Sequence, residues 1–185
     1  MDRSRTELGR PQLDAVFQHN PEYGQQPGHG GELADRLRAA FTVLEAEADA
    51  GHLTSYGVAT WEGFADGLFT VPQLDRLATE AAGGPDHHLR LVQLPVSLVM
   101  ADHLGESLHR YEPIHQAAER GWDVHASAPV HGGELLTLAT PEVAALVQER
   151  ATVVAACLAA TVRARVSQEC SCPPRTRHTG RTRSR

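Results

Sequence analysis

Mostly polar residues stand at the carboxyl ends of four short apolar stretches of the sequence. They are Gln18, His19 and Asn20 after the first stretch, Ala59, Thr60 and Trp61 after the second, Gln93 and Ser97 at the third, and Ser127 and His131 after the fourth. The set contains amides, hydroxyls and imidazoles but no pair of carboxylates. It favours hydrogen bonding to a neutral planar ligand over glycoside hydrolysis or metal-assisted chemistry.

The eleven histidines do not show the spacing of a metal site. The candidates are His87, His88, His103, His109 and His115, and none of them belongs to a His-Glu-x-x-His motif. Adjacent side chains on a strand point to opposite faces, so His87 and His88 cannot share a ligand there. We therefore expect solvent-facing histidines and no metal site.

The four apolar stretches alternate with helical patterns, which is typical of β/α units with parallel strands. We predict strands over residues 13–17, 53–58, 89–94 and 122–126. We predict helices over residues 33–48, 72–82 and 113–120 and from Thr140 to Val162. The strand starts are 40, 36 and 33 residues apart, and a strand, a helix and two loops need roughly 30 or more.

Helix boundaries and buried faces follow from capping residues and from apolar spacing. In the first helix the expected inward residues are Leu33, Leu37, Phe41, Leu44 and Ala48. Thr70 is the expected N-cap of the second helix, whose inward residues are Leu74, Leu77, Ala78 and Ala81. Thr140 followed by Pro141 opens the fourth.

Four consecutive β/α units fit either half of an eight-stranded barrel or a small doubly wound sheet. No Gly-x-Gly-x-x-Gly follows the first strand, and the loop there reads His19-Asn20-Pro21-Glu22-Tyr23. A Rossmann phosphate turn and a P-loop are therefore both absent. We predict the α/β class, as a partial (β/α)8 TIM barrel of about four parallel units.

Composition and charge divide the chain into a folded domain and a tail. The 185 residues are 41% hydrophobic and 22% charged, as in an average globular domain. No apolar run nears the ~20 residues that span a bilayer, and the first residues lack a secretory signal, so we expect a cytoplasmic protein without a membrane partner. Residues 1–162 contain ten arginines and twenty-two acidic residues; residues 163–185 contain seven arginines and one acidic residue.

The Arg-rich tail, residues 163–185, has no aromatic residue to stack on bases and no regular periodicity. We expect it to be disordered and nucleic-acid binding to be improbable, and a frame-shifted origin fits its Arg, Thr, Pro and Cys composition. Cys157, Cys170 and Cys172 match neither a disulfide framework nor a zinc knuckle.

Four motifs, in order, resemble the aldo-keto reductases. Residues 13–22, Leu-Asp-Ala-Val-Phe-Gln-His-Asn-Pro-Glu, look like the fourth strand and histidine motif of that family. Gly57-Val58-Ala59-Thr60-Trp61 is similar to its fifth-strand pattern, and Leu91-Val92-Gln93 to its sixth-strand Val-Gln. Residues 124–133 resemble its seventh strand and the glycine-containing continuation. The resemblance covers roughly residues 6–160.

The resemblance implies a (β/α)8 barrel that reduces a small-molecule carbonyl substrate with NADP (or NAD). His19 then corresponds to the catalytic histidine that hydrogen-bonds and polarises the carbonyl. Gln93 corresponds to the glutamine that contacts the nicotinamide carboxamide. In the family, a Ser-Asn pair holds this carboxamide. This chain has Ala59-Thr60 in its place, so the resemblance leaves the Thr60 hydroxyl as the cofactor-binding group. Ser127 stands where the family has the aromatic ring that stacks on the nicotinamide.

The family's catalytic tyrosine, lysine and aspartate lie in strands upstream of the histidine motif. Only eighteen residues precede His19 here, they contain no tyrosine or lysine, and the whole chain has no lysine. We therefore expect a truncated reductase that is inactive alone, with a second chain completing the barrel. The alternative is a non-catalytic remnant or an interaction module that uses its exposed strand edges.

Overall fold

The computed structural model describes residues 2–23, 30–99 and 113–169. Its centre is a four-stranded parallel sheet in the order β1-β2-β3-β4. The strands are β1 Leu13–His19, β2 Leu53–Ala59, β3 Leu89–Pro95 and β4 Asp123–Ser127. The predicted α/β class with four parallel units is therefore confirmed.

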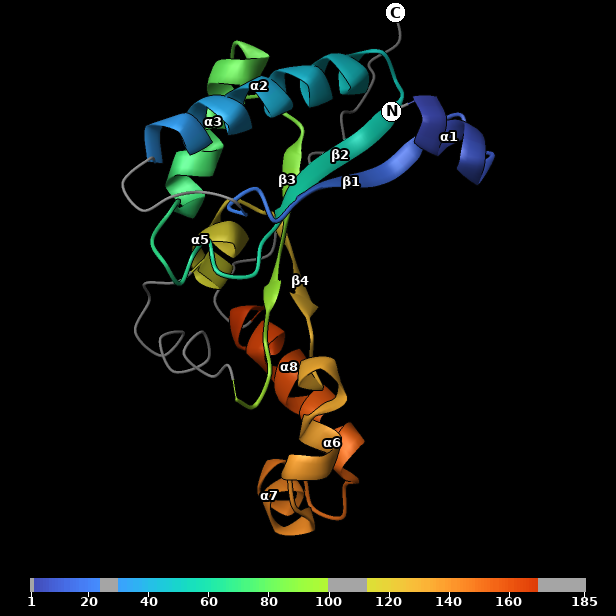
Figure 1. Cartoon of the computed structure of the whole chain (residues 1–185), viewed down its shortest axis with the longest axis vertical. Helices are drawn as coiled ribbons and strands as arrows, with labels where there is room; N and C mark the ends of the chain where they lie inside the picture. Colours follow the sequence, from blue (N-terminus) through green and yellow to red (C-terminus); the bar gives the residue numbers. More distant parts are fainter. Residues whose placement is uncertain (1, 24–29, 100–112, 170–185) are drawn as a thin grey trace, which may run out of the picture.

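Helices follow each strand of this sheet (Figure 1). A short helix, α1 Asp2–Leu8, precedes β1. The helices between strands are α2 Gly30–Asp49, α3 Val71–Ala82 and α5 Pro113–Glu119. After β4 come the 3-10 turn η2 His131–Gly133 and the helices α6 Leu135–Leu138, α7 Pro141–Val147 and α8 Val153–Glu169.

The sequential strand order determines where the helices lie. Crossovers between parallel strands are right-handed, so three successive crossovers in one direction place their helices on the same face of the sheet. The hydrophobic core forms there, with Phe41 of α2 packed against Tyr56 of β2 at 5.2 Å between ring centroids. Leu91 and Ala59 are buried on the opposite face and do not belong to this core.

The amphipathic patterns of the sequence are confirmed in α2 and α3. Every predicted inward residue of α2 is buried: Leu33, Leu37, Phe41, Leu44 and Ala48. In α3, Leu74, Leu77 and Ala78 are buried as predicted, whereas Ala81 is half-buried. Thr70 caps this helix, and its hydroxyl oxygen accepts from the Gln73 amide while the Gln73 side chain accepts from the Thr70 amide.

The prediction of one continuous helix from Thr140 to Val162 is wrong. Thr140 caps a helix as expected, but α7 ends at Val147 and Arg150 has a φ of +60°, which an α-helix cannot contain. The Thr152 hydroxyl oxygen then accepts from the Ala155 amide and caps a new helix. This second helix, α8, passes the predicted boundary at Val162 and continues to Glu169.

The expectation of solvent-facing histidines is wrong for His87. Its side chain is 4% exposed and bonded to Asp75, because it packs between α3 and the start of β3 rather than on an open strand face. His88 is half-buried against Glu45. His103, His109, Cys170 and Cys172 lie outside the described residues, and Cys157 is buried in α8.

Within the described ranges, no helix has the length and apolar character needed to cross a membrane.

Gly57 allows β2 and β3 to approach each other closely. A Cβ atom built at Gly57 would lie 2.5 Å from both the Cβ and the carbonyl oxygen of Leu91. We expect Gly57→Ala to lower the free energy of unfolding by about 2 kcal/mol, because the backbone of β3 would have to shift. Urea unfolding followed by circular dichroism measures the change.

Gly31→Ala is the matched control. Gly31 lies in the first turn of α2 and an added Cβ would meet no atom within 4 Å. Alanine favours helix, so this variant should be as stable as the parent or slightly more stable. Equal stability of both variants would contradict the close approach at Gly57.

Candidate functional site

Two of the predicted site residues lie in one row across the sheet. The strand register aligns His19 with Ala59, Ala59 with Gln93, and Gln93 with His125. Residues aligned in adjacent parallel strands point to the same face, so the four side chains share one face near the carboxyl ends of the strands. His19 is the last residue of β1 rather than a loop residue, which fixes its direction.

The face that carries this row is the one opposite the main hydrophobic core. One step toward the strand starts, the aligned residues are Phe17, Gly57, Leu91 and Asp123. Phe17 meets His125 edge-on, with ring centroids 5.7 Å apart. This contact spans the two outer strands, β1 and β4. The row is therefore bordered by the apolar side chains of Phe17 and Leu91.

The polar atoms of His19 and Gln93 are available to a ligand. Within the described part of the chain, neither side chain forms a hydrogen bond, and His19 is exposed while Gln93 is half-buried. Ala59 between them contributes only a methyl group. An imidazole and an amide separated by a small residue can bind the carbonyl and amide groups of a planar ligand lying across β2.

Thr60 is not part of this row. It follows Ala59, and its hydroxyl donates to Glu22 Oε1 at 2.6 Å and accepts from the Gly63 amide at 2.9 Å. The backbone amides of Trp61 and Glu62 also donate to Glu22 Oε1, at 2.9 and 3.2 Å. The structure thus places Thr60 in a contact between the loops after β1 and β2, and the single proton of its hydroxyl is used there.

Glu22, which no sequence motif marks as a site residue, joins the two loops beside the row. It is 6% exposed, and its Oε2 atom is buried without a hydrogen-bond partner. Burial raises the pKa of this carboxyl, but the hydrogen bonds from Thr60 and from backbone amides outweigh burial and lower the pKa below its ordinary value. An ionised carboxylate therefore ties the β1 loop to the β2 loop beside His19.

His125 was also missed as a member of the site. The alternation in β4 could have indicated it, because Val124 is buried while Asp123 and His125 on either side are exposed. No comparable signal marks Glu22, since a single Glu after Asn-Pro is ordinary loop sequence. Its role depends on a residue 38 positions away.

The loop after β4 closes one side of the row. Ser127 aligns with Pro95 of β3, and the next residue, Ala128, has a φ of +50°. His131 lies against Trp61, with ring centroids 6.4 Å apart. Trp61 is half-buried in this contact. The loops after β2 and β4 therefore meet at the carboxyl end of the sheet.

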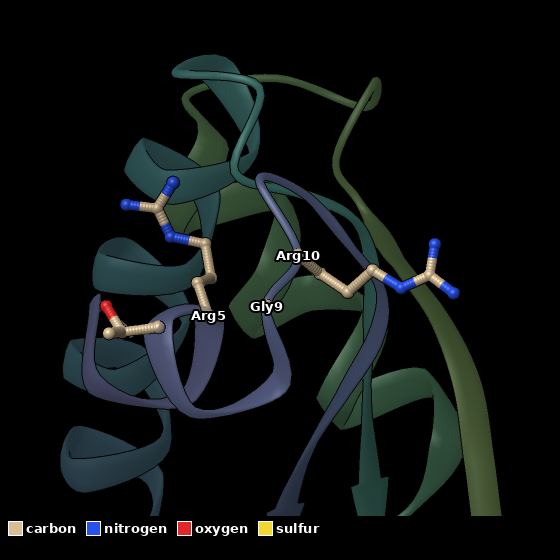
Figure 2. Close-up of a pocket in the computed structure, with 4 residues that line it drawn as sticks. Arg5, Gly9 and Arg10 are labelled. Carbon is tan, nitrogen blue, oxygen red and sulfur yellow. The ribbon is translucent and has the colours of Figure 1, made fainter.

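A hollow at α1 does not form a second candidate site. Arg5, Thr6, Gly9 and Arg10 line a volume of about 420 Å³. Figure 2 shows the guanidinium groups of Arg5 and Arg10 pointing away from each other, so they do not converge on one ligand. Arg5 Nη1 donates to the carbonyl oxygen of Pro11 at 3.0 Å, which braces the turn before β1.

Among residues 2–23, 30–99 and 113–169, no group of three or more His, Cys, Asp or Glu side chains is placed to hold a metal ion. Comparison with protein-family models finds no match to the chain. No curated protein matches it significantly either.

The Glu22 contact predicts a pH-dependent loss of stability. Glu22→Ala leaves the Thr60 hydroxyl and two backbone amides without their acceptor, so we expect it to lower the free energy of unfolding by about 2 kcal/mol at pH 7. Because the pKa of Glu22 is lowered in the folded state, its contribution is present above the ordinary value of 4.5 and is lost as the pH falls below it. The difference between parent and variant should therefore shrink in acid.

Urea unfolding at pH 7 and at pH values below 4.5 tests this. Glu62→Ala is the control, because Glu62 is an exposed carboxylate in the same loop and its removal should change stability little at either pH. A Glu22→Ala effect that is independent of pH would contradict an ionised carboxylate in the contact.

Proposed function

We propose that the chain is part of an NAD(P)H-dependent carbonyl reductase of the aldo-keto reductase type and belongs to a (β/α)8 barrel. The observation that carries the proposal is the row in which His19 and Gln93 share one face of the sheet. The resemblance supplies the chemistry of the two residues, and their register supports a common site. They stand two strands apart, roughly 10 Å at the usual strand spacing.

In this proposal His19 donates a hydrogen bond to the carbonyl oxygen of the substrate and stabilises the negative charge that develops there. Gln93 binds the carboxamide of the nicotinamide ring, since its amide can both donate and accept. A bound nicotinamide would supply the hydride that reduces the carbonyl carbon. Thr60 contributes by holding the β2 loop through Glu22, and Ala59 places only a methyl group between His19 and Gln93.

Neither a lysine nor the tyrosine of the sheet can act as the proton donor of the reaction. The chain contains no lysine, and the tyrosine of the sheet, Tyr56, is buried on the helix side and donates to Glu45 at 2.7 Å. Burial raises the pKa of Tyr56 far above its ordinary value, and the neighbouring Glu45 carboxylate raises it further. We infer that a second polypeptide completes the barrel and brings the missing acid.

Binding of NADPH to the full chain tests the nicotinamide half of the proposal. We expect saturable quenching of Trp61 and Trp122 fluorescence by NADPH or NADH. Gln93→Leu should weaken the affinity about fivefold, because one polar contact to the carboxamide is lost. Gln148→Leu is the matched control, since Gln148 lies in the turn after α7 and its substitution should change nothing.

The role of His19 is tested by binding of 4-nitrobenzaldehyde to the NADPH-loaded chain, because the chain alone is expected to lack the proton donor for turnover. His19→Ala should weaken aldehyde binding while leaving NADPH affinity unchanged, since the hydrogen bond to the carbonyl oxygen is lost. His115→Ala, on the half-exposed side of α5, should bind the aldehyde like the parent. If the chain binds neither NADPH nor NADH, the reductase proposal fails.

The unpaired edges of the two outer strands of the described sheet support a second candidate function, in which the chain is an interaction module. β1 and β4 are the ends of the described sheet, and each pairs with a neighbour on one side within it. Unpaired strand edges bind an added strand from another chain. A single stoichiometric protein that co-purifies with a chain unable to bind nicotinamide would support this function over the first.

A further inference from the structure

A cluster of charged groups lies at the opposite end of the sheet from His19 and Gln93. Arg90 follows the first residue of β3, His87 precedes that strand, and Arg120 follows α5. With Asp75 of α3, Pro85, Gly121 and Trp122, they line a hollow of about 390 Å³. This volume is in the range of small-ligand sites.

A buried histidine organises the cluster. His87 Nε2 lies 3.1 Å from Asp75 Oδ1, and His87 Nδ1 lies 3.2 Å from Arg90 Nη1. Arginine can only donate, so Nδ1 accepts and the proton of the neutral ring is on Nε2, which donates to Asp75. The imidazole also packs edge-on against Trp122, with ring centroids 6.4 Å apart. His87 is thereby fixed in position and holds Arg90 at the hollow.

Both arginines retain donors that the protein does not use. Arg90 donates through Nη1 alone, to His87 and to the Leu89 carbonyl oxygen. Arg120 donates through Nε to Asp75 and through Nη1 to the Gln116 carbonyl oxygen. Within the described residues, Arg90 Nε and Nη2 and Arg120 Nη2 make no hydrogen bond.

The hollow carries positive charge in an acidic protein. Two guanidinium groups and one carboxylate line it, and the neutral imidazole adds no charge, whereas the whole chain has a net charge of −6. The single carboxylate, Asp75, is already occupied by Arg120 and His87. Arg120 is the arginine that pairs with Asp75, so within the described residues the Arg90 guanidinium has no carboxylate partner.

We propose that this hollow binds a small oxyanion, a phosphate or carboxylate group, between Arg90 and Arg120. Guanidinium groups bind such anions through paired, charge-assisted hydrogen bonds. The volume exceeds that of a bare ion, so it accommodates an organic anion with a short polar body. The site lies at the amino ends of β3 and β4 and does not depend on the proposed reductase function.

Titration of the full chain with inorganic phosphate and, separately, with citrate tests the proposal by isothermal calorimetry. We expect saturable binding of at least one anion, and the stronger of the two distinguishes a phosphate from a carboxylate ligand. Arg90→Gln should weaken this binding about tenfold, because it removes the unused donors and the charge. It leaves the ion pair between Arg120 and Asp75 in place.

Arg76→Gln is the matched control. Arg76 is an exposed arginine of α3 whose ion-pair partner is Glu80, and its substitution should leave anion binding unchanged. The ring resonances of His87 give a second readout in the unaltered chain, since an anion on Arg90 should shift them. Three results would overturn the proposal. They are an equal loss of anion affinity in the two variants, no saturable binding of either anion, and anion binding that leaves the His87 ring resonances unshifted.

Discussion

The parallel register of the four strands is the constraint on which the rest of the structure depends. Because each strand pairs with the next in sequence, every crossover returns on the same face, and α2, α3 and α5 cover that face with one hydrophobic core. The opposite face of the sheet carries short rows of aligned side chains. His19 and Gln93 share a row for this reason alone, although 74 positions separate them in the chain.

The two ends of the sheet are held by different electrostatic contacts. At the carboxyl end, the Glu22 carboxylate accepts from Thr60 and from two backbone amides, and so joins the loops that flank His19. At the amino end, Glu45 of α2 accepts from the Tyr56 hydroxyl and from both the amide and the ring of His88. Each carboxylate satisfies several donors at once, which offsets the cost of its burial. The sheet is thereby tied to its helices and loops at both ends, and the Glu22 contact is the one beside the candidate row.

Much of the architecture is predictable from the sequence because it rests on local rules. The spacing of Leu33, Leu37 and Phe41 predicts a buried helix face, and Thr70 and Thr140 predict two helix starts. The break between α7 and α8 escapes these rules, since residues 148–152 are compatible with helix and only the positive φ of Arg150 and the cap at Thr152 divide them. His87 escapes them as well. Its burial depends on Asp75, Arg90 and Trp122, which come together only when α3 packs beside β3 and β4.

The sequence by itself determined the α/β class, the number of parallel units and two residues of the candidate site, because apolar periodicity and strand-end position are properties of short segments. Tertiary structure alone decided which of those residues share one face of the sheet. Strand register brought His19 and Gln93 onto one face and added His125 to them, whereas a hydrogen bond to Glu22 drew Thr60 into a loop contact. Strand register and buried hydrogen bonds join residues that are tens of positions apart in the sequence. Which residues come together is therefore decided by the packing of the whole chain and not by the local pattern around each residue.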